Sequence, residues 1–256
     1  TAAAGLLVAL APSSLAQLTN YSQDFDALDM ADPAALAAQG FNAYANVFDP
    51  MGGFIGGYGF PAPNGGMGFS AIGTGLGGAA QGTQYIDVYS DYSNIEHGNG
   101  NYIDALVYRE QGVSATNVGQ TWRMSFDFLR NPAVTNGQGD TTMFAFVKVL
   151  MSSNGSFATI AEVELETTAA STTMWDTMSL DLVIDPAYAG ELLQYGFRSY
   201  ASNYNDSSVL YDNLTFEQQG GTPPSLMPYS QDFEGLDIAD PAALTADGYK
   251  IFANVF

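Results

Sequence analysis

The sequence contains no cysteine, which excludes a disulfide framework and a lipid-anchored cysteine within it. Positive charge is also scarce: the 256 residues include 6 Lys and Arg and one His against 27 Asp and Glu, a formal net charge of −21 at pH 7. So acidic a surface repels phosphate backbones and anionic membranes, which argues against nucleic acid as a partner. With one His and no Cys, a zinc site of the usual ligands is excluded as well.

Long apolar runs are scarce too, and one stands at the start of the chain. Residues 1–16 read TAAAGLLVALAPSSLA, an apolar stretch that ends in a small-x-small pattern. This pattern predicts the remnant of a secretory signal peptide, and hence a secreted or cell-surface protein. The stretch is too short to span a bilayer, so we expect no membrane insertion.

Two segments of the chain are nearly the same. Residues 21–48 read YSQDFDALDMADPAALAAQGFNAYANVF, and residues 229–256 read YSQDFEGLDIADPAALTADGYKIFANVF. A gap-free internal repeat of this length indicates tandem copies of one module. We therefore expect one complete module at 17–219, a Gly/Pro linker at 220–228, and the truncated start of a second copy at 229–256.

The repeated segment contains the start and stop signals of a short helix. Asp32 can accept a backbone N–H as the N-cap, and Pro33 suits the first helical position. Gly40 suits the left-handed residue that ends a helix. These signals predict one short helix near the N-terminus, over 32–40.

After Gly40, apolar residues recur with a period of two. Trp122, Met124 and Phe126 fall on one face of their segment, and polar residues fall on the other, as in a half-buried antiparallel strand. Strands are predicted at 41–48, 67–72, 84–91, 105–111, 121–129, 143–150, 157–166, 174–184, 192–200 and 208–217. Gly-rich stretches such as 51–59 and 73–82 lie between them. The sequence therefore predicts an all-β fold, an antiparallel two-sheet β-sandwich (jelly roll) with one short N-terminal helix.

The two ends of the module carry short motifs. It opens with DFD at 24–26 and closes with VLYDNL at 209–214, and Trp175 and LQYGF at 193–197 lie between them. This order resembles the jelly-roll carbohydrate-binding modules with a galactose-binding-like fold. Their first strand often carries an F-E or F-D pair, and their last strand often reads hydrophobic-D-N-hydrophobic. The resemblance implies a non-catalytic module that binds a polysaccharide or a cell-surface glycan.

Acidic residues cluster in the opening loop, at Asp24, Asp26, Asp29 and Asp32, and the second copy has a carboxylate at each corresponding position. Calcium takes six to eight hard oxygens from carboxylates and carbonyls. The resemblance implies in addition that the first-strand Asp26 and the last-strand Asp212 meet at a structural calcium. Asp24, Asp26 and Asp212 are thus the expected ligands. The alternative is that Asp32 caps the helix and the other acids are solvated.

Aromatic and cationic residues on predicted strands suggest a sugar-binding face. Tyr85 and Tyr89 alternate onto one face, and Tyr108 follows with Arg109 beside it. In so acidic a chain, a strand-borne cation such as Arg109 or Arg198 is either paired with a carboxylate or available to a ligand. We expect these five residues to bind a hydroxyl-rich or uronate ligand. The alternative is that the tyrosines belong to the core of the sandwich.

Two other patterns bear on catalysis. The segment EVELE at 162–166 places three carboxylates on one strand face, and paired carboxylates hydrolyse glycosides. It resembles the E-x-D-x-E strand of jelly-roll endoglucanases, with Glu164 in place of the Asp, although a solvated face explains it too. The single His97 stands in the turn-like EHGNG, which predicts a loop or surface position.

Together these patterns predict a secreted, non-catalytic glycan-binding module in a tandem array, with a structural calcium. Two alternatives stay open. One is a structural surface adhesin or matrix repeat without a defined small ligand, and the other is a jelly-roll glycan-cleaving enzyme.

Overall fold

The computed structural model describes residues 17–64, 70–90, 94–134, 141–202 and 206–220. The chain divides into two units, Thr1–Gly220 and Gly221–Phe256. The expected signal peptide at 1–16, most of the expected linker and the second copy lie outside the described residues. Within the described ranges, no helix is long and apolar enough to cross a membrane.

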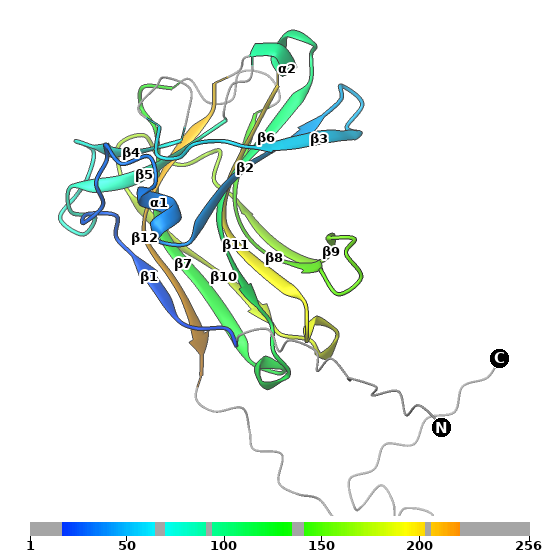
Figure 1. The fold of residues 1–256 in the computed structure, drawn as a ribbon. Coiled ribbons are helices and arrows are strands. Elements are labelled where there is room, and N and C mark those ends of the chain that lie inside the picture. The colour runs from blue at the N-terminus through cyan, green and yellow to red at the C-terminus, as the bar shows by residue number, and fades with distance from the viewer. Residues whose placement is uncertain (1–16, 65–69, 91–93, 135–140, 203–205, 221–256) are drawn as a thin grey trace, which may run out of the picture. The chain divides into compact units, whose positions relative to one another are not determined.

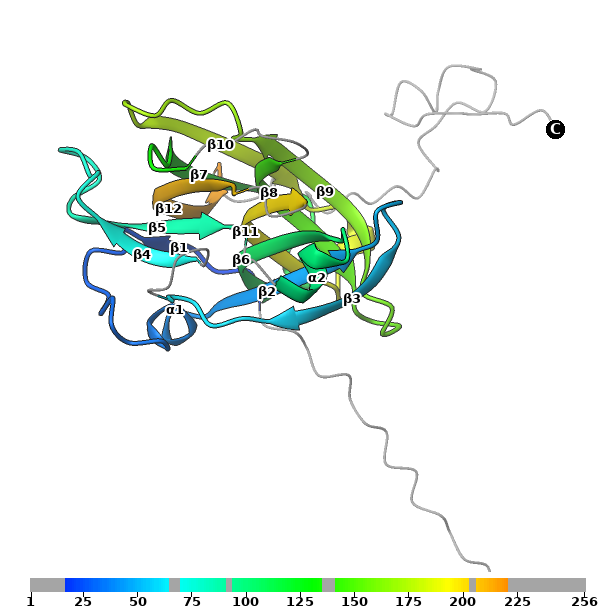
Figure 2. The same cartoon turned by 90° about the horizontal axis from the view of Figure 1, so that it is seen from above.

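The first unit is a β-sandwich of two antiparallel sheets, as the sequence predicts (Figure 1). Sheet A has the strand order β10-β7-β12-β5-β4, with β1 also paired to β12, and sheet B has the order β3-β2-β6-β11-β8-β9. The strands are β1 (Tyr21–Gln23), β2 (Phe41–Phe48), β3 (Phe54–Gly59), β4 (Ala71–Thr74), β5 (Gln84–Tyr89), β6 (Tyr102–Gly112), β7 (Thr121–Arg130), β8 (Thr142–Met151), β9 (Ala158–Glu166), β10 (Asp176–Val183), β11 (Leu192–Ser202) and β12 (Ser208–Gln219). Figure 2 shows the two layers from above.

Alternating apolar side chains hold the two sheets together. Trp122 and Phe126 of β7 point inward and are almost fully buried, which confirms the period of two. Ring pairs then join the layers: the ring centroids of Tyr195 and Phe216 lie 4.0 Å apart, and those of Phe197 and Tyr211 lie 3.7 Å apart. Each pair joins β11 of sheet B to β12 of sheet A, so the core runs through the middle of the sandwich.

Each predicted strand overlaps an observed one, and the segment 41–48 matches β2 at both ends. The Gly-rich stretch 51–59 was expected to be a connection. That prediction is wrong, because the stretch contains the edge strand β3. A Cβ at Gly57 would lie 2.6 Å from Tyr44 Cε1, so glycine lets the Tyr44 ring lie across β3. The resemblance places Asp26 on the first strand, but β1 ends at Gln23 and Phe25 has φ 59°, so Asp26 lies in the turn that follows.

The helical segments also differ from the prediction. The α-helix α1 (Ala35–Ala38) is shorter than 32–40, because Asp32 Oδ1 accepts from Ala34 N at 2.9 Å and caps the turn before it. Gly40 has φ +80°, the left-handed value expected after a helix. A second helix, α2 (Asn94–Gly98), occupies the segment predicted as a turn, and His97 within it is 1% exposed. The prediction of a surface histidine is therefore wrong.

Candidate functional site

The outer face of sheet B carries a groove of about 660 Å³. Its lining comes from the middle strands β2, β6, β11 and β8 and from the two edges of the sheet, where β3 and β9 lie (Figure 1). The lining residues are Tyr44, Asn46, Phe48, Phe54, Leu106, Tyr108, Glu110, Lys148, Leu150, Ser156, Phe157, Thr159 and Gln194.

Three aromatic side chains of the groove are open to water. Tyr44 is 37% exposed, Phe54 of β3 is 62% exposed and Phe157, just before β9, is 57% exposed. Phe157 has φ 53°, in the left-handed region that few residues other than glycine adopt. An exposed ring in a strained conformation adds little to the core, and such positions are typical of binding sites.

Gly196 in β11 fixes the place of Tyr108, which lies opposite it on β6. A Cβ at Gly196 would lie 2.4 Å from the Val107 carbonyl oxygen and 2.9 Å from Tyr108 Cβ. No other residue fits there without moving β6. The absence of a side chain therefore lets Tyr108 sit over the centre of the sheet, in the lining of the groove.

Polar groups cross the groove in one row. Glu110, Gln194 and Lys148 are register partners on β6, β11 and β8. Gln194 Nε2 donates to Glu110 Oε2 at 2.7 Å. Neighbouring strands lie about 4.8 Å apart, so the backbones at Glu110 and Lys148 are about 10 Å apart. The row offers acceptors and donors beside the aromatic rings.

Arg198, the other cation on this face, is held by carboxylates. Its guanidinium makes an ion pair with Glu164 of β9 and lies 3.8 Å from Glu162 Oε1 and 3.9 Å from Asp104 Oδ2. It also lies 4.8 Å from the centroid of the Phe144 ring. Arg198 is thus paired rather than available to a ligand.

Lys148, the second cation of this face, packs against an aromatic ring. Its Nζ lies 4.8 Å from the centroid of the Phe146 ring. Burial lowers the pKa of Lys148, while the charges of Asp104 and Glu162 act to raise it. Burial also raises the pKa of Asp104, against the pull of Arg198 and Lys148. This part of the face is a network of mutually compensating charges.

The five residues predicted to bind glycan do not form one surface. Tyr108 and Arg198 lie on the outer face of sheet B. Tyr85 and Tyr89 share one face of β5, as predicted, but that strand belongs to sheet A. Tyr85 is 5% exposed, and its hydroxyl donates to the Thr74 carbonyl at 2.8 Å.

Arg109 points to the opposite side of β6 from Tyr108, because successive side chains alternate along a strand. Its guanidinium lies 3.5 Å from the centroid of the Tyr21 ring, and its Nε donates to the Tyr195 hydroxyl at 3.2 Å. Arg109 therefore packs inside the sandwich, away from the groove.

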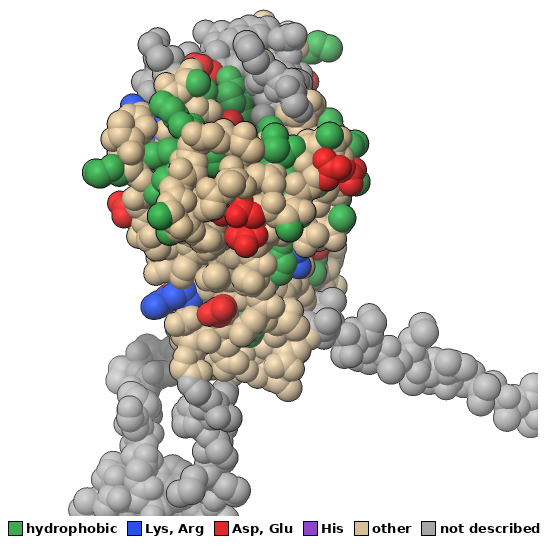
Figure 3. Space-filling model, turned by 90° about the vertical axis from the view of Figure 1, so that its left-hand side faces the viewer, with side chains coloured by type: hydrophobic (Ala, Val, Ile, Leu, Met, Phe, Trp, Pro, Cys, Tyr) green, Lys and Arg blue, Asp and Glu red, His purple; other side chains and the backbone are tan. Residues whose placement is uncertain are grey.

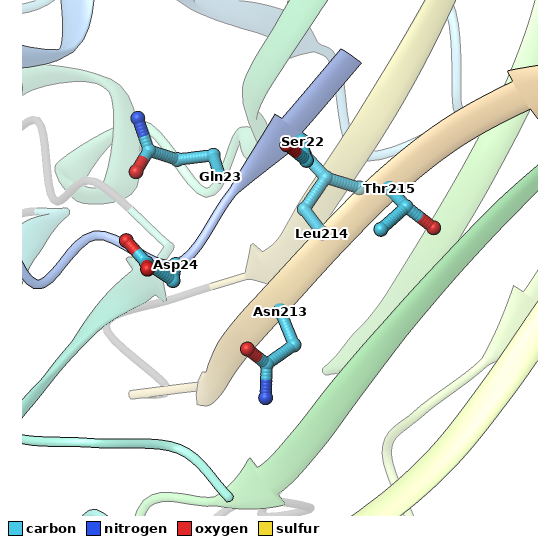
Figure 4. A pocket seen from close by; sticks show the side chains of 6 residues that line it. All are labelled: Ser22, Gln23, Asp24, Asn213, Leu214 and Thr215. Atoms are coloured by element: carbon cyan, nitrogen blue, oxygen red, sulfur yellow. The ribbon is translucent and has the colours of Figure 1, made fainter. Parts of the chain in front are cut away.

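The predicted acidic loop lies at the end of sheet A where β1 meets β12. A hollow of about 300 Å³ there is lined by Ser22, Gln23, Asp24, Asn213, Leu214 and Thr215. Asp24, on the chain after β1, and Asn213, on β12, are among the residues that line it (Figure 4). On the side of the molecule where β1, β4 and β5 lie, carboxylates appear at several separate places among uncharged side chains (Figure 3).

Asp26 is tied to the start of β5. Its Oδ1 accepts from Thr83 N at 2.8 Å, Gln84 N at 2.7 Å and Thr83 Oγ1 at 3.0 Å. The hydrogen bonds from Gln84 and Thr83 lower the pKa of Asp26. Gly82 has φ +60°, and a Cβ there would lie 2.0 Å from Asp26 Oδ2, so the loop needs glycine to bring this carboxylate in.

Asp212 is fully buried in β12, where the register with β7 shifts. Its Oδ1 accepts from Asn213 N at 2.6 Å, and its buried Oδ2 has no hydrogen-bond partner within the described part of the chain. Burial raises the pKa of Asp212 to about 7, and the charges of Asp26, Asp127 and Asp24 add to this effect. The fold thus brings the predicted Asp24 and Asp26 near enough to Asp212 for their charges to raise its pKa.

The other two acids of the loop act locally: Asp29 Oδ1 accepts from Ala31 N at 2.9 Å, and Asp32 caps a turn. The charge of Asp127, which was not predicted as a site residue, also raises the pKa of Asp212. The Asp127 carboxylate accepts hydrogen bonds from the side chains of Gln81, Asn213 and Thr177. As the side chains stand, no three His, Asp or Glu residues of the described ranges form a group that could hold a metal ion.

The carboxylates of EVELE point outward from β9, as alternation requires. Burial raises the pKa of Glu164, Arg198 lowers it, and neighbouring Glu162 raises it. Because Glu164 and Glu162 are engaged with Arg198, this strand face is part of the charge network described above.

No protein-family model matches the sequence, and no curated protein matches it. Among solved structures, it is similar to a xylan-binding domain, CBM22-2, of Paenibacillus barcinonensis Xyn10C, at 11% identity and a TM-score of 0.38, over 77% of this chain and 98% of that one.

A Stig cyclase of Fischerella sp. TAU is similar at 15% identity and a TM-score of 0.42, over 80% of this chain and 97% of the cyclase. The enzymatically active domain of bacteriophage CBA120 tailspike protein 4 is similar at 9% identity and a TM-score of 0.38, over 58% of this chain. The match spans 17% of the tailspike chain. Similarity at this level says nothing about the ligand or activity of the present chain.

Proposed function

We propose that this protein is a non-catalytic glycan-binding module whose ligand lies in the groove of sheet B. Exposed Tyr44, Phe54 and Phe157, which face one groove, carry this proposal. Flat rings stack on the C–H faces of sugars, and the row from Glu110 to Lys148 offers partners for hydroxyls. A groove with rings and a few placed polar groups is the usual form of a ligand site.

Binding is tested by affinity electrophoresis in gels that contain soluble polysaccharides, followed by calorimetry with the oligosaccharide that retards the protein. Tyr44→Ala and Phe157→Ala should weaken binding at least ten-fold each, since stacking on one ring contributes about 1.4 kcal/mol or more. Tyr44→Phe keeps the ring and should bind as the native protein does. Met174→Ala, which truncates a side chain that is 70% exposed outside the groove, is the second control.

A protein that retains full affinity in both Ala variants binds elsewhere, and one that no polysaccharide retards is not a glycan-binding module. The second outcome would favour a surface adhesin or matrix repeat that has no defined small ligand.

A structural calcium at the acidic end of sheet A is part of the proposal. Asp24, Asp26 and Asp212 would hold it, together with backbone carbonyls, because calcium prefers hard oxygens in a tolerant geometry. The partnerless Oδ2 of buried Asp212 supports this assignment. When bound, the ion would neutralise the mutual repulsion of these carboxylates.

Secretion and a tandem arrangement complete the proposal. The apolar start of the chain supports export, and the repeat at 229–256 supports a second copy of the module. Weak sites on one chain gain avidity through their effective concentration, which gives the repetition a physical purpose.

A further inference from the structure

Glu110 is the one carboxylate among the residues that line the groove of sheet B. Asp104, Glu162 and Glu164 surround Arg198 within 4 Å. Glu110 is exposed, and no Lys or Arg of the described ranges lies within ion-pair distance of it. It is therefore an uncompensated negative charge in the lining of the groove.

The Glu110 carboxylate has a defined place. Gln194 Nε2 donates to its Oε2 at 2.7 Å, which holds the carboxylate toward the middle of the sheet. Glu110 stands two positions after Tyr108 on β6, so the two side chains lie on the same face of the sheet, and the charge of Glu110 adds to burial in raising the pKa of Tyr108. A negative group is thus presented beside an aromatic residue of the groove, Tyr108.

A carboxylate beside aromatic faces is the arrangement that recognises an ammonium group, because both the charge and the ring quadrupole attract a cation. The two cations of the same face do not oppose this. Arg198 is ion-paired, and Lys148 lies over the Phe146 ring among the charges of Asp104 and Glu162.

We infer that the groove selects glycans that carry free amino groups, such as chains of glucosamine, and that Glu110 is the residue that determines this preference. The inference rests on the proposed function, since it names the ligand class of the same groove. Uronate and sulfated glycans should bind more weakly, because Glu110 repels them and Arg198 is already paired with carboxylates.

The experiment measures calorimetric affinity of the full chain for three hexasaccharides: glucosamine, N-acetylglucosamine and galacturonic acid. We expect the glucosamine hexamer to bind at least ten-fold more tightly than its acetylated counterpart, and the galacturonic acid hexamer to bind more weakly than either. Glu110→Gln should reduce that preference to less than three-fold, because it lowers the affinity for the glucosamine hexamer.

Glu217→Gln is the matched control, because it removes the same charge from an exposed position on β12 of sheet A. It should keep the full preference for the glucosamine hexamer. If Glu217→Gln lowers the affinity as much as Glu110→Gln does, the attraction comes from net charge alone and Glu110 has no special role.

The outcomes separate this inference from the proposed function. Equal affinity for the two amino-sugar hexamers, lost in Tyr44→Ala, overturns the preference while the groove remains a glycan site. Binding of the galacturonic acid hexamer as tightly as the glucosamine hexamer overturns the preference too. If no hexamer and no soluble polysaccharide binds, both the preference for amino sugars and the proposed function are overturned.

Discussion

Replacing Asp212 by Asn tests whether the ionised Asp212 carboxylate destabilises the fold at the acidic end of sheet A. Asp212 is 0% exposed, and burial together with Asp26, Asp127 and Asp24 raises its pKa from 3.8 to about 7. A shift of this size corresponds to a loss of folding stability of up to about 4 kcal/mol when the group is ionised. Asn has the same shape, and its Oδ1 can still accept from Asn213 N. In a chelator at pH 8, we therefore expect Asp212→Asn to be more stable than the native chain.

The change of folding stability with pH tests the direction of this electrostatic effect. Because the pKa of Asp212 is higher in the folded state than in the unfolded chain, folding takes up a proton between pH 3.8 and about 7. The native chain should thus gain stability as the pH falls through this window, and the advantage of Asp212→Asn should shrink toward zero near pH 4. Urea denaturation with EDTA at pH 8, 6 and 4, followed by tryptophan fluorescence, measures the difference.

Calcium should close most of the stability difference between the two proteins. At a hundred times its Kd, a ligand of the folded state stabilises by about 2.7 kcal/mol, and the Asp212→Asn variant lacks one of the proposed carboxylates. Asp176→Asn, at an exposed position of β10, is the control, and its stability should respond to pH and to calcium as that of the native chain does. If Asp212→Asn is less stable than the native chain in EDTA at pH 8, the electrostatic reasoning is refuted. A native stability that calcium does not change would refute the metal site.

Three further substitutions test the packing, each by urea denaturation. Gly196→Ala should destabilise by roughly 1–3 kcal/mol, because the added methyl meets the Val107 carbonyl; an unchanged protein would mean that β6 and β11 separate freely. Arg198→Met should cost about 3 kcal/mol at pH 8 and less at pH 4, where the carboxylates around it protonate; an equal loss at both pH values would show that its apolar packing dominates. Arg109→Met should cost about 2 kcal/mol through the lost contacts with Tyr21 and Tyr195, and it should leave glycan affinity unchanged; weaker binding would place Arg109 in the groove.

The sandwich could be predicted because its signals are local. Alternation over two residues marks a strand wherever it is, and β2 follows it from Phe41 to Phe48. The motifs around Asp26 and Asp212 could be recognised too, since they stand at the two ends of the module, although Asp26 lies in the turn after β1 and not on the strand. The strand β3 could not be predicted, because its glycines weaken the strand pattern.

The groove could not be predicted, because alternation does not say which strands become neighbours. Tyr85 and Tyr108 look alike in the sequence, yet one lies in sheet A and the other in sheet B. Phe157 stands at the first position of a predicted strand, and Phe54 stands in a Gly-rich segment predicted to be a connection. Only the strand order brings them to one surface. A large aromatic residue isolated in such a segment was the one available signal.

The internal repeat now bears on the groove as well as on the domain boundaries. The outward positions of β2 that line the groove, Tyr44, Asn46 and Phe48, correspond in the second copy to Phe252, Asn254 and Phe256. An outward position that served only solubility would gain nothing from an aromatic ring in both copies. The exchange of Tyr44 for Phe252 keeps the ring and loses the hydroxyl. Under the proposed function, this exchange predicts that Tyr44→Phe leaves the affinity of the groove for its ligand unchanged.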